Sequence, residues 1–137
     1  MTTSKTLSLL IMDPPYESAN TTTAFRLIQS AINKGHHVNV FAYEGAVSLS
    51  MKGQEPHPNP VHGTTVEEEQ HPTTKDWIAS LFQLARRQGA ILTWTNCGMC
   101  VDERGAGDWI EGCRRGGPKD FYEMSKISDA TLVIPTK

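Results

Sequence analysis

Short apolar runs of the kind that form buried strands alternate along this chain with segments of helical periodicity. The first run, residues 6–12, is almost continuously apolar and ends at two prolines, as a parallel strand covered on both faces does. Similar runs follow at 37–43, 90–95 and 130–134. Strands separated by helices imply right-handed crossovers. We therefore expect an α/β fold, a three-layer sandwich with a mostly parallel central sheet of four to five strands and helices on both faces.

Helical periodicity fills the intervals between these runs. The first helix is expected to begin near Asn20, which can cap it, and to end at Gly35. A second helix is expected to open at a weak variant of the capping box near Thr73 and to end at Gly89. A third begins at Pro118, a residue suited to the first helical position, and leads into the last strand. Each helix has one apolar face, as a helix that covers a sheet requires.

Length and charge limit the class of protein. A chain of 137 residues fits one domain, here residues 1–137. The 13 basic and 15 acidic residues give a net charge of −2 and form no basic block, so nucleic acid is not an expected partner. The apolar run at 7–12 is too short to cross a bilayer and has no small-residue cleavage site. We expect a cytoplasmic protein with no membrane partner.

The connection at about 44–72 is the least regular part of the chain. It is long and polar, with several prolines, the acidic run 67–69 and the histidines His57, His62 and His71. A connection of this length inside a compact domain usually forms a lid or a partner-binding loop, or is disordered. Scattered histidines in a polar loop are usually solvated, so we assign these three no role.

Three cysteines in a chain with no export signal favour reduced thiols over a disulfide scaffold. Cys97 follows the strand predicted at 90–95, and so lies at the sheet edge where α/β proteins bind ligands. If Gly98 begins a helical turn, its N–H group and the local dipole favour a thiolate at Cys97, with Arg104 as a further cation. The alternative is that Cys97 is a small apolar filler of the core.

Cys97 and Cys100 form a CxxC pair, which is typical of a redox dithiol or of half a zinc site. Zinc would need Cys113 and a loop histidine, at spacings that match no zinc motif. Two arginines follow Cys113 and could lower its pKa, but Arg-Arg-Gly-Gly is also typical of an exposed turn, the interpretation we favour. No glycine-rich phosphate-binding motif follows any strand. We predict no metal site and no cofactor.

The pattern as a whole resembles the DsrE/TusD family (DsrE/DsrF-like sulfur-relay proteins) over nearly the entire chain. The similar segments are the proline turn at 12–16, the helix end and second strand at 35–47, a cysteine after the third strand with Arg-Gly further on (here Cys97 and Arg104), and the final helix and strand at 117–134. No single motif is diagnostic, so the resemblance rests on the order and spacing of all these segments.

The resemblance implies that Cys97 accepts sulfane sulfur from a TusA-like small sulfur-carrier protein, holds it as a persulfide and passes it to an acceptor. Cys100 is then a possible second thiol. It also implies a homo- or hetero-oligomer, a trimer or hexamer built from this chain or from related DsrE/F/H-type subunits. Attack by the Cys97 thiolate on a donor persulfide needs no cofactor.

Several alternatives stay open at this stage. The chain could be a non-catalytic structural subunit of a heteromeric sulfur-relay complex, or a dithiol reductase that uses Cys97 and Cys100. Either Cys100 or Cys113 could resolve a persulfide on Cys97 into a disulfide. The sequence does not decide whether the protein counts as an enzyme, what its donor and acceptor are, or whether sulfur flows toward oxidation or toward tRNA thiolation.

Overall fold

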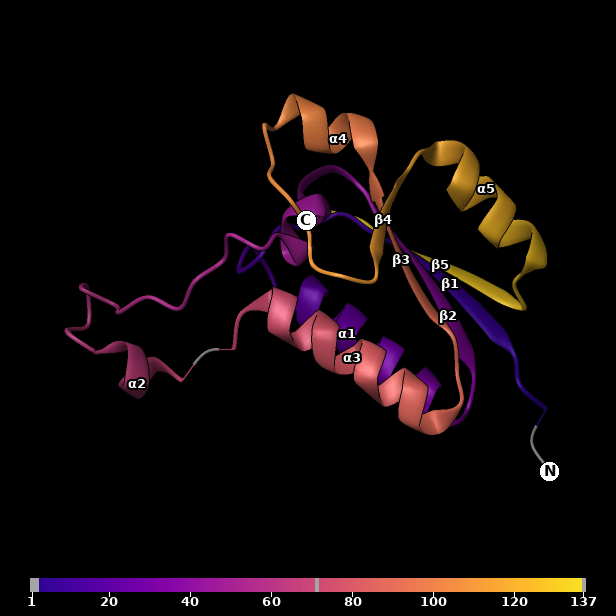
Figure 1. Cartoon of the computed structure of the whole chain (residues 1–137), viewed down its shortest axis with the longest axis horizontal. Helices are drawn as coiled ribbons and strands as arrows, with labels where there is room; N and C mark the ends of the chain where they lie inside the picture. Colours follow the sequence, from indigo (N-terminus) through magenta and orange to yellow (C-terminus); the bar gives the residue numbers. More distant parts are fainter. Residues whose placement is uncertain (1–2, 71, 137) are drawn as a thin grey trace.

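A computed structural model describes residues 3–70 and 72–136 and shows a five-stranded sheet (Figure 1). All four strand pairs are parallel, and the strand order is β4-β3-β2-β1-β5. The strands are β1 (Thr6–Ile11), β2 (His37–Ala42), β3 (Leu92–Cys97), β4 (Cys113–Gly116) and β5 (Ala130–Ile134). The predicted α/β class and parallel sheet are confirmed.

Helices cover both faces of this sheet. Helices α1 (Asn20–Asn33) and α3 (Thr74–Gln88) pack side by side on one face. Helices α4 (Gly98–Glu103) and α5 (Pro118–Ile127) lie on the other face (Figure 1). The arrangement is the predicted three-layer sandwich. No helix of the described residues is long and apolar enough to span a membrane.

The core consists of two clusters of buried side chains, one on each side of the sheet. The larger cluster joins α1 and α3 to the sheet, and Phe25, Trp77 and Trp94 meet inside it. The smaller cluster lies beneath α4 and α5 and contains Phe41, Val47, Cys97, Cys100, Val101 and Met124. The sheet therefore separates the molecule into two compartments, and the CxxC pair lies in the smaller one.

The third strand ends two residues later than predicted. Asn and Cys at positions 96 and 97 continue β3, although asparagine is unfavourable in strands. The Asn96 side chain is fully buried and donates a hydrogen bond to Ser50 Oγ at 2.9 Å, which compensates part of the cost of its burial. Cys97 is consequently the last residue of the strand and not a loop residue.

The turn expected around Cys113 is wrong, because these residues form the edge strand β4, although Arg114 and Arg115 in it are exposed as expected. Its sequence, Cys-Arg-Arg-Gly, has no strand-like pattern of its own. Pairing with β3 places Cys113 beside Trp94 and Gly116 beside Cys97. Arg114 adds a side-chain hydrogen bond from Nε to Thr95 Oγ1 at 2.9 Å. This segment is a strand because it pairs with β3, and the local sequence pattern gives no sign of that long-range pairing.

The segment at 44–72 is more ordered than predicted at its start. A 3-10 helix, η1 (Glu44–Ser50), buries Ala46, Val47 and Leu49 in the two core clusters. The later part is a polar loop that carries one short helix, α2 (Val66–Glu69). His71, one of the three loop histidines, lies outside the described residues.

Candidate functional site

Cys97 lies at the carboxyl end of β3, immediately before α4, as the predicted helical turn at Gly98 required. Its side chain is on the α4 and α5 side of the sheet, where it packs in the smaller cluster. The residue is only 2% exposed, so its thiol is closed to solvent in this conformation, although a position at the ligand-binding edge of a sheet implies access. The reason is that α4 turns back over the end of β3, and Cys100 and Val101 join the same cluster.

Cys100 is the nearest functional partner of Cys97. The thiol of Cys97 is close enough to that of Cys100 to raise the pKa of Cys100. The backbone N–H of Glu44 also donates to Cys100 Sγ, with a nitrogen to sulfur distance of 3.2 Å. Glu44 has a left-handed backbone (φ 50°) at the point where β2 gives way to η1. The carboxyl ends of β2 and β3 therefore meet at this pair of thiols.

The electrostatic surroundings of Cys100 keep its proton in place. Burial raises the pKa of the Cys100 thiol, and the neighbouring Cys97 thiol raises it further. The Glu44 N–H and, more weakly, the Arg104 guanidinium oppose this by lowering the pKa, and the net direction is upward. Cys100 is therefore held as a thiol in the folded protein.

Cys113 lies in the other compartment. Its register partner is Trp94, and it packs against the larger cluster, whereas Cys97 belongs to the smaller one. Burial raises its pKa to about 12, despite a hydrogen bond with Ser50 that lowers it. The two neighbouring arginines therefore do not activate this thiol. The sheet stands between Cys113 and Cys97, so the structure does not bring these two residues together.

Arg115 is a site residue that sequence reasoning missed. Its guanidinium lies against the Cα of Gly98: a Cβ added at Gly98 would stand 2.5 Å from Arg115 Cζ and 2.5 Å from Nε. Two hydrogen bonds of 3.1 and 2.6 Å join it to the Asp102 carboxylate on α4. That partner raises the pKa of Arg115, and negative charge on Cys97 adds to the effect. Arg115 is thus a permanent cation beside Cys97.

No local signal pointed to Arg115, because its place depends on the pairing of β4 with β3. Arg104, the cation that was predicted, is the C-cap residue of α4, and its charge acts to lower the pKa of Cys100. It lines a surface depression of about 380 Å³ at the carboxyl edge of the sheet. Glu44, whose N–H bonds Cys100, lines the same depression, together with Asp13, Pro14, Glu17 and Ser48. This is an acidic recess next to the thiol pair.

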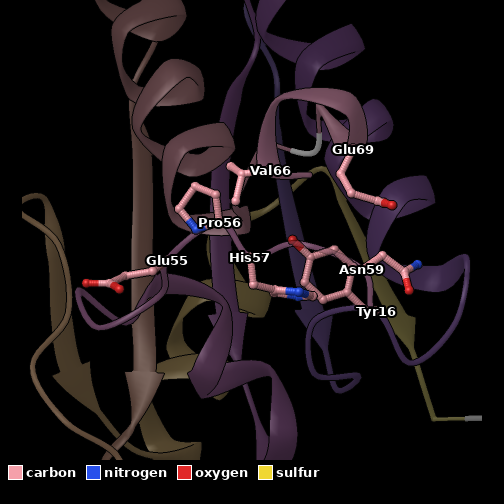
Figure 2. A pocket seen from close by; sticks show the side chains of 7 residues that line it. All are labelled: Tyr16, Glu55, Pro56, His57, Asn59, Val66 and Glu69. Carbon is pink, nitrogen blue, oxygen red and sulfur yellow. The ribbon is translucent and has the colours of Figure 1, made fainter. Parts of the chain in front are cut away.

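A second pocket, of about 270 Å³, lies in the polar loop (Figure 2). Tyr16 lies beside His57 and Asn59 of the loop there, and Glu55 also lines the pocket. No cysteine lines it. Among the residues that the structure describes, no three histidine, cysteine, aspartate or glutamate side chains are grouped so that they could hold a metal ion.

Comparison with known proteins agrees with this architecture. The DsrE/DsrF-like family matches residues 5–134. A protein of Methanopyrus kandleri designated MK0008 is 28% identical over 128 residues, which cover 92% of this chain and 91% of that protein. The crystal structure of the YchN protein of E. coli superposes with a TM-score of 0.67 at 17% sequence identity, over 94% of this chain and 98% of that one. The likeness to YchN is one of fold.

Proposed function

The chain belongs to the DsrE/DsrF-like family, and this membership supports a general role in sulfur relay. On this basis we propose that it is a cytoplasmic carrier of sulfane sulfur. The sulfur is held as a persulfide on Cys97, taken from a small TusA-like carrier protein and passed to a downstream acceptor. The observation that carries the proposal is the position of Cys97 at the end of β3, with the Arg115 cation against the next residue and the Cys100 thiol in the same cluster.

The transfer step is an attack by the Cys97 thiolate on the terminal sulfur of the donor persulfide. A bond forms between Cys97 Sγ and that sulfur, the sulfur–sulfur bond of the donor breaks, and the donor leaves as a thiolate. A persulfide on Cys97 is itself readily ionised, and the positive charge of Arg115 next to Gly98 favours the anion. No resident cofactor enters this step.

The burial of Cys97 means that sulfur transfer needs a local opening. Helix α4 has only six residues, and its link to β4 is an exposed ion pair between Arg115 and Asp102, which water screens. Met99, between the two cysteines, is 68% exposed. A short helix that is held to its neighbouring strand by a screened ion pair is the kind of segment that opens more easily than the sheet. Movement of α4 would uncover Cys97 while the sheet stays intact.

Sulfur loading of cysteine variants tests the proposal. After incubation with glutathione persulfide, we expect the wild-type chain to react with one equivalent of donor at Cys97, and Cys97→Ser to react only at background level, because a serine hydroxyl is a far weaker nucleophile at neutral pH. Intact-protein and peptide mass spectrometry, under conditions that block free thiols at the end of the reaction, measure the site.

Cys113→Ser is the matched control, since it removes a thiol of the other compartment and should load like the wild type. Equal loading of Cys97→Ser would overturn the proposal. The burial of Cys97 favours one rival, a non-catalytic subunit that completes a sulfur-relay complex. In that case neither glutathione persulfide nor a thiol-alkylating reagent would modify Cys97 in the folded protein.

We further propose that the chain assembles with copies of itself or with related subunits, as a trimer or hexamer. The outer edge of the sheet supports this proposed assembly. Strand β5 is the last strand on that edge, and Leu132 and Val133 in it are exposed. Tyr122 and Ile127 of the adjoining α5 are also exposed. An open strand edge with exposed apolar side chains is the kind of surface that subunit contacts cover.

Light scattering after size exclusion tests this assembly. The wild-type chain should have the molar mass of a trimer or hexamer, and Val133→Glu should shift it toward the monomer, because a charge would be buried in the contact. Ile91→Glu places the same charge at an exposed apolar residue just before β3 and should leave the mass unchanged. A wild-type monomer at all concentrations would contradict the proposal.

A further inference from the structure

The second thiol of the CxxC pair forms and breaks no bond in the transfer step proposed above. Cys100 is 7% exposed and packs in the same buried cluster as Cys97, three residues away in the chain. Among the three cysteines of the chain, Cys113 lies on the opposite face of the sheet. Inside the folded chain, a sulfur atom on Cys97 can therefore react with the thiol of Cys100 and not with that of Cys113.

The spacing of the pair permits a disulfide. Cys97 directly precedes α4, and Cys100 lies in its first turn. One turn of helix advances about 5.4 Å, and a disulfide requires Cα atoms within about 7 Å of each other. Cys100 can therefore bond to Cys97 without a change in the sheet.

Building on the persulfide proposed for Cys97, we propose that Cys100 is a resolving thiol that turns the carried sulfur into hydrogen sulfide. The Cys100 sulfur attacks Cys97 Sγ, the bond between the two cysteine sulfurs forms, and the bond from Cys97 Sγ to the terminal sulfur breaks. The terminal sulfur leaves as hydrosulfide and takes the proton of Cys100. The carried sulfur is reduced, the two cysteines are oxidised to a disulfide, and an external dithiol reductant restores them.

The contacts of Cys100 suit this role. Its sulfur accepts the Glu44 N–H at 3.2 Å, and this donor stabilises the negative charge that develops as the proton leaves. In the resting protein, burial and the neighbouring Cys97 thiol raise the pKa of Cys100, so that it is held as a thiol. A thiol held in this way is weakly nucleophilic until the persulfide forms beside it.

The test compares sulfide release from the wild type, Cys100→Ser and Cys113→Ser. Each reduced protein is given one equivalent of glutathione persulfide, and sulfide is followed with a sulfide-selective electrode while the protein mass is recorded. We expect the wild type and Cys113→Ser to release about one sulfide per chain and to become lighter by two hydrogen atoms, as an internal disulfide requires. Cys100→Ser should keep one added sulfur and release sulfide only when dithiothreitol is added.

The outcomes separate the two proposals. If Cys100→Ser and the wild type both keep the added sulfur equally long, the resolving role is wrong and the carrier role stands. If neither of them ever gains sulfur, both proposals fall. Cys100→Ala, which introduces no polar group into the cluster, repeats the measurement if Cys100→Ser is poorly folded, and peptide mapping of the disulfide in the wild type needs no variant. A disulfide that includes Cys113 would also overturn the inference.

Discussion

Replacement of Phe25 by alanine should lower the free energy of unfolding by about 3–5 kcal/mol, the usual cost of removing a buried aromatic side chain from a core. Phe25 is fully buried where α1, α3 and β3 meet. Its ring lies 4.7 Å from that of Trp77 in an edge-to-face arrangement and 6.1 Å from that of Trp94. Alanine would leave a cavity between two large rings that cannot collapse without moving two helices.

Urea unfolding followed by tryptophan fluorescence measures this loss, since two of the three tryptophans contact Phe25. Leu27→Ala is the matched control on the same helix. Leu27 is 38% exposed, and we expect it to cost about 1 kcal/mol or less. Similar losses for the two variants would mean that the larger cluster does not hold the sheet and the two helices together as described.

Alkaline pH should remove up to about 4 kcal/mol of stability through Cys113 alone. The pKa of its thiol is about 12 in the folded chain against an ordinary value of 9.0, and one pKa unit corresponds to about 1.4 kcal/mol. Below pH 9 both the folded and the unfolded chain hold the proton, so the contribution is complete. Between pH 9 and 12 only the unfolded chain ionises, and the stability falls.

Comparison of the wild type with Cys113→Ser isolates this effect. Serine does not titrate in this range and can keep the hydrogen bond with Ser50. The other groups that titrate at alkaline pH, Cys100 among them, are common to both proteins. The difference in free energy of unfolding should therefore change steadily from pH 9 to 12 in favour of the variant. Parallel curves over this range would show that Cys113 is not buried as a thiol.

The division of the cysteines between two compartments organises the chemistry of this chain. Cys97 and Cys100 lie together beneath α4, near Arg115 and next to the acidic recess lined by Glu44. Cys113 supports the packing of β4 on the far side of the sheet. The raised pKa of the Cys113 thiol ties its proton to stability, and the two thiols at the sheet edge are those that the proposed sulfur chemistry uses.

Much of the fold could be predicted from the sequence. The apolar run at 6–12, the stripe of the helix that ends at Gly89 and the strand at 130–134 are local signals, because a buried strand or an amphipathic helix shows its period in its own residues. The order of these signals was enough to predict a parallel sheet with helices on both faces and to identify the resemblance to the DsrE/DsrF-like family. The placement of Cys97 at the carboxyl end of the third strand followed from the same pattern.

Other features of the site had no local signal. Strand β4 consists of Cys-Arg-Arg-Gly and exists because β3 pairs with it. The end of β3 includes Asn96, whose burial depends on Ser50 in a segment expected to be a loop. Arg115 reaches Gly98 only through the β3–β4 register. Each of these depends on contacts between residues far apart in the chain.

The sequence by itself determined the order and type of the main elements, and with them the edge of the sheet at which Cys97 ends its strand, because hydrophobic periodicity is a property of neighbouring residues. Only the tertiary structure decided which thiol meets Cys97, which cation lies beside it and whether solvent reaches it. Those outcomes depend on which face of the sheet each side chain occupies and on what packs over it. Cys100 and Cys113 are alike as residues, and the sheet between them makes one a partner of Cys97 and the other a part of the core.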